Sequence, residues 1–303
     1  MVVQMNEPVL HRPVMLEEVL AFLTPAPGCI FVDATLGAGG YSEAILQKTL
    51  GHATVVGLDR DADAIEAASQ RLSEYKTFQP IHTEFGQMDD ALHSLGLEKI
   101  DGLVADLGVS SMQLDQPVRG FSFLQDGELD MRMDVSQKNT AADIVNYEKQ
   151  EALAKILWQY GEERFSRRLA RRIVERRRTK KFTSTVELAE FIAATIPGKR
   201  DQIHPATRSF QALRIATNNE LGELERLCTL AEQIVKPSGT FVCVSFHSLE
   251  DRLVKQAHRQ RTQNGKPLWE LLTRRPATPT DDEKSVNPRS RSARLRAARR
   301  LAP

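Results

Sequence analysis

Three aspartates in this chain each close a short apolar run, and their carboxylates predict a site for a cationic ligand. Each run has the length and apolar content of a strand buried on both faces of a parallel sheet. The carboxyl ends of parallel strands share one edge of the sheet, so the three side chains are expected to converge on one crevice. The aspartates are Asp33, Asp59 and Asp106, and the runs are residues 30–33, 54–59 and 100–106.

A glycine-rich turn between the first two runs indicates a nucleotide cofactor. Residues 37–40 have the sequence Gly-Ala-Gly-Gly, and the strand, turn, helix and strand predicted over 30–59 form half of a nucleotide-binding unit. An isolated turn of this kind can also be a tight connection that binds nothing. Asp59 favours binding, because the acid that ends the second strand accepts ribose hydroxyls in adenosine-binding sheets.

The residues around the turn favour S-adenosylmethionine over a dinucleotide. The third glycine of the dinucleotide fingerprint is expected at position 42, where this chain has Ser42. A pyrophosphate binds backbone N–H groups at a helix N-terminus, and the nearby Asp33 carboxylate would repel it. S-adenosylmethionine carries an ammonium, a sulfonium and no phosphate. We therefore expect S-adenosylmethionine as the cofactor and S-adenosylhomocysteine as the product.

The remaining pattern predicts a Rossmann-like α/β core. A leading helix is expected over 14–23, because apolar residues recur there at helical spacing and two prolines follow. Further helices are expected over 42–48, after Asp61 and after Phe246, with strands over 79–83 and 239–246. Two short apolar stretches, 267–273 and 292–298, are expected to close the sheet as a hairpin.

The segment between Asp106 and the strand expected over 239–246 is much longer than a single crossover needs. Its pattern is mostly helical, which predicts an inserted all-helical subdomain over 136–205. The α/β core is then discontinuous and consists of residues 1–135 and 206–303.

Composition limits the class of protein. The 303 residues are enough for one large domain with an insert. No apolar run has the length of a signal-peptide core or a membrane span, so a soluble, cytoplasmic protein with no membrane partner is expected. Cys29, Cys228 and Cys243 are far apart and lack metal-ligand spacing. Buried reduced thiols are therefore expected rather than a disulfide or a metal site.

A net charge of +1 conceals a strong division of charge along the chain. Residues 1–160 contain 11 Lys and Arg against 24 Asp and Glu, whereas residues 161–303 contain 30 against 16. Such a division predicts that a polyanionic partner meets one part of the molecule.

Two segments carry most of the positive charge. Residues 164–181 have ten basic residues and one acid, with Phe165, Leu169 and Ile173 forming an apolar stripe on a predicted helix. Six arginines and no acid follow Pro288. A charged face exposed to water is the alternative, but so large an excess repels itself unless a polyanion neutralises it. These segments therefore predict contacts to nucleic-acid phosphates.

Several further motifs are not generic loop or helix composition. They are residues 106–115, 119–123, 129–134, 161–165, 204–215, 218–221 and 245–252. Together with the glycine turn, they resemble the family of ribosomal RNA small subunit methyltransferase H from about His11 to the terminal arginines. The resemblance implies an enzyme that uses S-adenosylmethionine to methylate the exocyclic N4 of a cytidine in the decoding region of bacterial 16S rRNA. The partner would be 16S rRNA within the 30S subunit.

The resemblance also implies a set of cofactor contacts. They are Gly39, Gly40, Tyr41, Asp59, Phe85, Asp106 and Gln113. Members of the family often carry His where this chain has Tyr41. A backbone contact at that position would persist, whereas a side-chain contact would differ.

The expected chemistry needs a hydrogen-bond acceptor for the cytosine amine. Its nitrogen is a poor nucleophile because the lone pair is delocalised into the ring, and an acceptor on its N–H groups helps it to pyramidalise. Asp106 or a neighbouring carbonyl is the candidate, and a role for Asp106 toward the cofactor alone is the alternative. His247 is either a base or the N-cap of the next helix.

The segment after Asp106 has the composition of a ligand lid. Phe121 or Phe123 would stack there on a cytosine taken out of its helix. The alternative is that these rings, together with Met131 and Met133, pack the subdomain.

Two other classes of protein remain open from the sequence. One is an RNA-binding or ribosome-assembly protein without turnover, which the three aspartates disfavour. The other is an NAD-dependent oxidoreductase, which Ser42 and the basic segment disfavour, and titration with each cofactor separates the two. The sequence does not distinguish a monomer from a homodimer.

Overall fold

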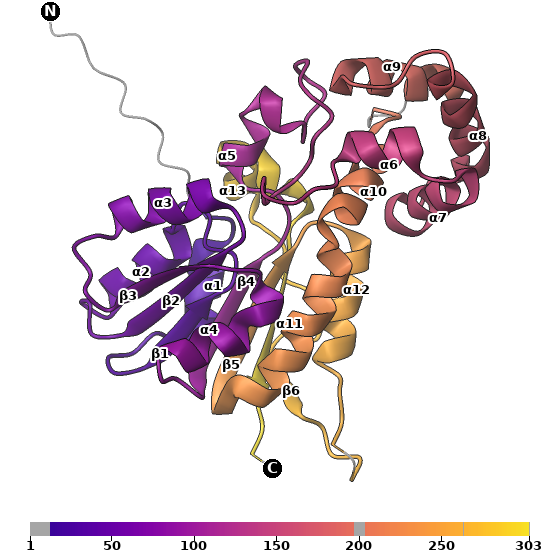
Figure 1. The fold of residues 1–303 in the computed structure, drawn as a ribbon. Helices are drawn as coiled ribbons and strands as arrows, with labels where there is room; N and C mark the ends of the chain where they lie inside the picture. The colour runs from indigo at the N-terminus through magenta and orange to yellow at the C-terminus, as the bar shows by residue number, and fades with distance from the viewer. Residues whose placement is uncertain (1–12, 197–203, 263, 303) are drawn as a thin grey trace, which may run out of the picture. The chain divides into compact units, whose positions relative to one another are not determined.

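The computed structural model describes residues 13–196, 204–262 and 264–302. In these residues seven strands form one sheet in the order β3-β2-β1-β4-β5-β7-β6 (Figure 1). Neighbours among β1 to β5 are parallel, and β7 runs antiparallel to both β5 and β6. The strands are β1 (Ile30–Asp33), β2 (Thr54–Asp59), β3 (Phe78–His82), β4 (Ile100–Asp106), β5 (Val235–Ser245), β6 (Trp269–Leu271) and β7 (Arg294–Arg300).

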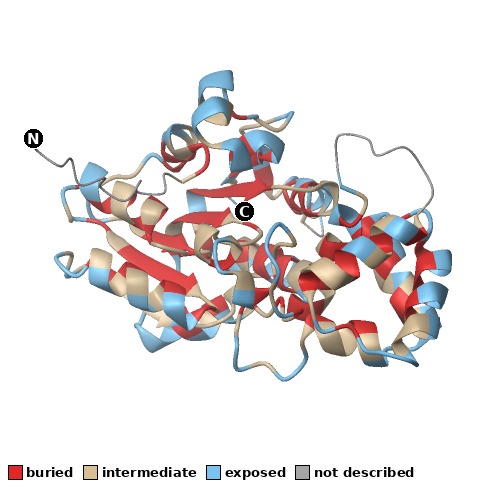
Figure 2. Ribbon diagram, turned by 90° about the horizontal axis from the view of Figure 1, so that it is seen from above, coloured by how far each residue is buried: buried red, intermediate tan, exposed pale blue. Residues whose placement is uncertain are grey.

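Helices cover both faces of the sheet, because its strands are apolar on both sides (Figure 2). Successive strand residues point to opposite faces. Phe31 accordingly packs in the cluster with α1, α2 and α3, whereas Val32 packs in the cluster with α4, α11 and α12. These helices are α1 (Leu16–Leu23), α2 (Gly40–Lys48), α3 (Ala62–Arg71), α4 (Met88–Ser94), α11 (Glu220–Ile234) and α12 (Ser248–Ala257).

The predicted α/β core is confirmed. The expected leading helix, the helices after the glycine turn, Asp61 and Phe246, and the strands ending in aspartate are all present. The predicted hairpin is also present, with Leu271 of β6 opposite Ala298 of β7. No helix within the described ranges has the length and apolar character that crossing a membrane requires.

The chain divides into two compact units. The first comprises residues 1–108 and 223–303 and contains the sheet, and the second comprises residues 109–222. The predicted insert, 136–205, lies inside the second unit, and its residues 197–203 lie outside the described ranges. Its boundaries stay a prediction.

The second unit is built of helices around an apolar core of its own. The core includes Leu153 and Leu157 of α7, Leu169 of α8 and Leu213 of α10. The helices are α5 (Ser111–Leu114), α6 (Ala141–Tyr147), α7 (Gln150–Gly161), α8 (Ser166–Arg177), α9 (Thr185–Thr195) and α10 (Thr207–Asn218).

The stripe predicted on the basic segment is present only in part. Leu169 and Ile173 are buried, but Phe165 is 38% exposed. Phe165 precedes the helix, which begins at Ser166, so its side chain leaves the buried face. The prediction that Phe165 continues the stripe is wrong.

The arginines of the C-terminal tail do not all face solvent, which corrects their assignment as a uniform set of phosphate contacts. β7 lies inside the sheet between β5 and β6, so some of its side chains are covered. Arg296 is 6% exposed, and its Nε and Nη2 donate to the Asp251 carboxylate at 2.7 and 3.2 Å. Arg300 packs over the Trp269 ring at 5.7 Å. These two arginines stabilise the fold.

Candidate cofactor and catalytic site

The carboxyl ends of β1, β2 and β4 lie side by side at one edge of the sheet. Asp33 is opposite Gly57 of β2 and Val104 of β4. Asp59 and Asp106 each lie two residues further along, about 6.6 Å beyond Asp33 along their strands. The chain leaves β1 toward β2 on one side and reaches β4 on the other, and ligands of open α/β sheets bind at such a switch point.

The turn after β1 is held by hydrogen bonds to both neighbouring strands. The Leu36 N–H donates to a carbonyl of β2 at 2.9 Å, and the Gly37 N–H donates to Oδ2 of Asp59 at 2.8 Å. On the other side, the Asp106 N–H donates to the Thr35 hydroxyl at 2.6 Å. The glycine turn is therefore fixed between the two aspartates that end β2 and β4.

Gly39 and Gly40 are required by backbone geometry and by close packing. Gly39 has a φ of 80°, in the left-handed region that favours glycine. A Cβ at Gly40 would clash with the ring of Pro13. Pro13 thus covers the N-terminal end of α2, which is the position where a dinucleotide places its pyrophosphate. The turn fits a cofactor that has no phosphate.

Asp33 lies beneath the turn and is fully buried. Its Oδ2 accepts a hydrogen bond of 2.8 Å from the hydroxyl of Ser42, which is also buried. This bond explains why a serine occupies the position where a dinucleotide site has its third glycine. Burial raises the pKa of Asp33 to about 6, against the opposing effect of the Ser42 hydrogen bond. Because Asp33 is buried, it can contribute negative charge to the site but cannot contact a ligand directly.

Asp106 is the carboxylate at this edge that lacks full hydrogen bonding. Its Oδ2 accepts from the hydroxyl of Tyr41 at 3.4 Å, and the same hydroxyl donates to the carbonyl of Val14. Oδ1 is buried and has no hydrogen-bond partner among the described residues. Burial, followed by the charge of Asp33, raises the pKa of Asp106 well above its usual value. An uncompensated buried oxygen of this kind is matched by a cation or a hydrogen-bond donor on a ligand.

Asp59 holds the turn and keeps capacity for a ligand. Its Oδ1 accepts from the Asp61 N–H at 2.9 Å, and its Oδ2 accepts from Gly37. Each carboxylate oxygen accepts two hydrogen bonds, so one position on each remains for a diol. Burial raises the pKa of Asp59 above its usual value.

The side chain of Tyr41 is directed into the protein. It is buried, and its hydroxyl contacts Val14 and Asp106. Burial, followed by the charge of Asp106, raises its pKa well above the usual value, so the phenol keeps its proton. Tyr41 thus acts on the site through Asp106.

The remaining predicted contacts lie in different units. Phe85 is half-buried in the short 3₁₀ helix Phe85–Gln87, which follows β3 in the first unit. Gln113 is buried in α5 of the second unit, where its Oε1 accepts from the Ser110 N–H at 3.1 Å in a capping box. The structure therefore brings six of the seven predicted contacts to one unit, and Gln113 belongs to the other.

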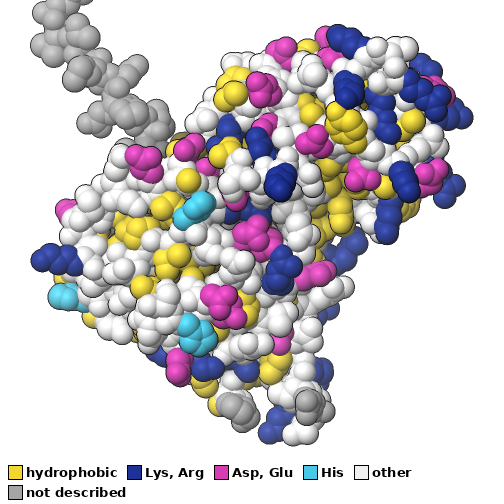
Figure 3. Space-filling view, in the orientation of Figure 1, with side chains coloured by type: hydrophobic (Ala, Val, Ile, Leu, Met, Phe, Trp, Pro, Cys, Tyr) yellow, Lys and Arg dark blue, Asp and Glu magenta, His cyan; other side chains and the backbone are white. Residues whose placement is uncertain are grey.

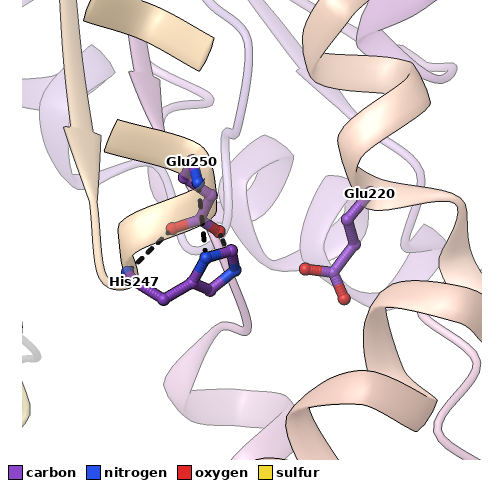
Figure 4. Close-up of side chains that lie close together, drawn as sticks. All are labelled: Glu220, His247 and Glu250. Atoms are coloured by element: carbon purple, nitrogen blue, oxygen red, sulfur yellow. Dashed lines mark hydrogen bonds and ion pairs between the residues drawn. The ribbon is translucent and has the colours of Figure 1, made fainter. Parts of the chain in front are cut away.

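His247 caps α12, which is one of the two roles that the sequence allows (Figure 4). Its Nδ1 accepts from the Glu250 N–H at 3.3 Å, and Oε2 of Glu250 accepts from the His247 N–H at 3.2 Å. Accepting the helix N–H requires an unprotonated Nδ1, so the ring proton lies on Nε2, 3.0 Å from Oε1 of Glu250. The lone pair that a base would use is engaged in the cap.

The predicted lid residues pack within the second unit. Met131 and Met133 are buried, as the packing interpretation expects. The Phe123 ring contacts Phe210 at 4.7 Å and His204 at 4.8 Å between ring centroids. Phe121 is half-buried beside the Arg119 guanidinium. Stacking of either ring on a cytosine stays a prediction.

Sequence reasoning missed three groups that shape the site. Thr35 binds the Asp106 backbone, and a hydroxyl two residues after a strand end was an available signal for it. Glu283 accepts from the Met15 N–H at 2.6 Å and adds to the negative charge around Asp106. The Val14 carbonyl completes the contacts of Tyr41. The last two lie far along the chain from their partners and have no local sequence signal.

The donor set fits S-adenosylmethionine. Within the described ranges, neither Asp33 nor Asp106 forms an ion pair with Lys or Arg, so no basic side chain balances their negative charge when they are ionised. A sulfonium and an ammonium would balance it. The free acceptor positions of Asp59 suit a ribose diol, and Pro13 occupies the place that a pyrophosphate needs.

Comparison with known proteins identifies the family of this chain. A model of the MraW methylase family matches residues 8–301. Ribosomal RNA small subunit methyltransferase H of Syntrophobacter fumaroxidans is 48% identical over 304 residues, covering 95% of each chain. The protein of the same name from Gloeobacter violaceus is 50% identical over 295 residues, covering 97% of this chain and 89% of that protein. The chain belongs to the MraW methylase family.

Proposed function

We propose that this protein transfers a methyl group from S-adenosylmethionine to the exocyclic N4 of a cytidine in 16S rRNA. The observation that carries the proposal is the match to ribosomal RNA small subunit methyltransferase H over nearly the full length of both chains. The unbalanced carboxylates at the ends of β1 and β4 support it independently, because they suit a cationic methyl donor. The decoding region is the proposed target, and the 30S subunit is the proposed form of the substrate.

Each residue of the acidic edge has a proposed task. Asp59 binds the ribose hydroxyls, and backbone atoms of Gly39 and Gly40 contact the cofactor. Asp33 attracts the positive charge from beneath the turn. Phe85 and Gln113 are proposed as further cofactor contacts. When bound, S-adenosylmethionine supplies an electrophilic methyl group on a sulfonium.

Asp106 is proposed as the group closest to the chemistry. Its free Oδ1 can accept a hydrogen bond from the target amine, which localises the nitrogen lone pair for attack. Tyr41 holds the other oxygen and keeps the carboxyl oriented. A role for Asp106 toward the cofactor alone predicts a different outcome on mutation. Asp106→Asn would then weaken cofactor affinity and leave turnover at saturating cofactor intact.

The RNA is proposed to bind the basic surface of the second unit. Figure 3 shows Lys and Arg side chains gathered over α8. Phosphate contacts at this surface would position the RNA without selecting a sequence, so binding should weaken steeply with salt. Selection of the base would fall to the segment after Asp106, with Phe121 or Phe123 as the proposed stacking ring. Bacterial ribosomal RNA is cytoplasmic, so the enzyme is proposed to act there.

The test uses a methyl-labelled cofactor. The full-length protein is incubated separately with 16S rRNA, 30S subunits and DNA of matched length, and the modified base is identified by mass spectrometry. Label at N4 of cytidine in rRNA or in 30S subunits is expected, and Asp59→Asn should lose it at low cofactor concentration. Label in DNA alone, label at a ring carbon, or no binding of S-adenosylmethionine would overturn the proposal.

A further inference from the structure

Trp158 is an exposed tryptophan of the second unit. It lies in the last turn of α7 and is 58% exposed, whereas the chain's other tryptophan, Trp269, is 3% exposed. The neighbouring aromatic Phe165 is 38% exposed. Exposed indole surface is unfavourable in water, so a ligand that covers it gains binding energy.

The two aromatic side chains lie at one helix corner. The Glu162 N–H donates to the Trp158 carbonyl at 3.1 Å, and the Glu163 N–H donates to the Leu157 carbonyl at 3.2 Å. Oε1 of the buried Glu163 accepts from the Phe165 N–H at 2.8 Å at the start of α8. These bonds fix the end of α7 against the start of α8. The corner is therefore a rigid part of the second unit.

Arginines of the same corner are available to an external anion. Arg164, Arg167 and Arg168 are exposed and have no ion pair within the described ranges.

The arginines at the other end of α8 are engaged in the fold. Arg176 pairs with Glu187 of α9, and Arg177 donates to the carbonyls of Val145 and Glu148. Arg171 and Arg172 pair with Glu175, so the available arginines are those at and just before the N-terminal end of α8. The corner also contains the exposed Glu162 and the buried Glu163, whose carboxylate is used in the cap.

The exposed aromatic rings of this unit also differ, because one already has a cationic neighbour and another has none. Tyr147 is exposed, but the Lys181 ammonium lies 4.3 Å from its ring centroid and occupies one face. Trp158 has no ring or cation contact of this kind among the described residues. The free ring of Trp158 therefore lies on the last turn of α7, and the available arginines follow across the turn into α8.

We propose that Trp158 stacks on an unpaired base of the RNA substrate while Arg164, Arg167 and Arg168 bind the adjoining phosphates. Aromatic side chains beside a cationic surface are the common platform for single-stranded nucleic acid. A duplex keeps its bases stacked inside and would contact only the arginines. The corner thus selects a single-stranded segment, whatever its sequence. This inference rests on the proposed rRNA substrate.

The test measures binding apart from methylation, with the full-length protein. The probes are a single-stranded oligoribonucleotide, an RNA duplex of the same length and inorganic polyphosphate. The variants are Trp158→Ala and Trp158→Phe, with Leu124→Ala as the control, because Leu124 is 89% exposed in the same unit. Thermal unfolding of each variant shows whether it folds.

Trp158→Ala should weaken binding of the single strand by about tenfold and leave binding of polyphosphate unchanged. Trp158→Phe should keep part of the affinity, and Leu124→Ala should match the wild type. The single strand should also quench wild-type tryptophan fluorescence more than the duplex does, and Trp158→Ala should abolish the difference. For methylation, Trp158→Ala should raise KM for RNA and leave kcat unchanged.

Three results would overturn the inference. They are unchanged single-strand affinity in Trp158→Ala, an equal loss for all three probes, and dissociation of an oligomer by this substitution, which would assign the ring to a second copy of the chain. If wild-type protein methylates rRNA in any of these cases, the proposed function stands and only the stacking site fails. If wild-type protein methylates no RNA, the proposed function itself fails.

Discussion

Replacing Ser42 by alanine should destabilise the protein by an amount that depends on pH. The Ser42 hydroxyl donates at 2.8 Å to the buried Asp33 carboxylate, whose pKa is about 6 in the folded protein. At pH 8 the carboxylate is ionised, and losing a hydrogen bond to a charged group costs about 1.5–3 kcal/mol. At pH 5 the group is mostly protonated, and losing a neutral hydrogen bond costs about 0.5–1.5 kcal/mol. The two conditions should therefore differ by about 1 kcal/mol.

The same result follows from proton linkage. The folded pKa of Asp33 is raised from 3.8 to about 6. The contribution of Asp33 to the free energy of unfolding of the wild type is therefore greatest at low pH and is lost as pH rises through 6. Without the Ser42 hydrogen bond the folded pKa rises further, by about one unit for 1.4 kcal/mol. The variant should therefore lose more stability than the wild type between pH 5 and pH 8.

The assay is urea unfolding at pH 5 and pH 8, followed by the fluorescence of the buried Trp269 in a Trp158→Phe background. Ser69→Ala is the matched control, because the Ser69 hydroxyl donates at 2.6 Å to the Ile65 carbonyl within α3 and contacts no ionisable group in that bond. Its effect should be the same at both pH values. An equal effect of Ser42→Ala at pH 5 and pH 8 would refute the reasoning, because Asp33 would then not be the titrating partner.

Three further outcomes are expected. Asp59→Asn should weaken S-adenosylmethionine binding about 10- to 100-fold in calorimetry, and unchanged affinity would remove Asp59 from the site. Burial lowers the pKa of His258 to about 3, so its contribution to stability is lost as pH falls below 6.5. Between pH 6.5 and pH 5 the free energy of unfolding of the wild type should therefore fall by about 1.5 kcal/mol more than that of His258→Phe, measured by urea unfolding. A difference in unfolding free energy that is the same at both pH values would contradict this. Asn218→Ala should destabilise the second unit by about 3 kcal/mol, because the buried Met133 N–H and Met131 carbonyl lose partners at 2.8 and 2.7 Å, whereas Asn139→Ala at an exposed position of the same unit should not.

Local patterns were sufficient to predict the part of the site that lies on consecutive elements. The aspartates that end β1, β2 and β4 share one edge because parallel strands impose it, and the alternation of strand and helix is visible in the sequence. The capping role of His247 was one of two possibilities, because the sequence His-Ser-Leu-Glu contains the spacing of a capping box.

Contacts between distant segments were not predictable in this way. The Val14 carbonyl, Tyr41 and Asp106 meet through packing, and no periodicity links their positions. The sequence does not distinguish Arg296 from an exposed arginine. In the fold, however, its strand lies inside the sheet and its partner Asp251 lies on α12. Phe165 fits the helical spacing of its neighbours, but the helix begins one residue later. Charge and spacing describe a segment, whereas its neighbours in the fold decide which side chains remain accessible.

The interrupted order of the sheet has a consequence for biosynthesis. β4 pairs with β5, with Leu103 opposite Phe241, so the strand beside Asp106 joins the sheet only after the whole helical unit has been synthesised. The helical unit is contiguous and can fold on the ribosome first, because domains fold as units during synthesis. Until β5 is synthesised, the edge of β4 stays apolar and unpaired. We expect nascent chains halted before residue 235 to depend on chaperones and to acquire their basic helical surface before any capacity to bind a methyl donor.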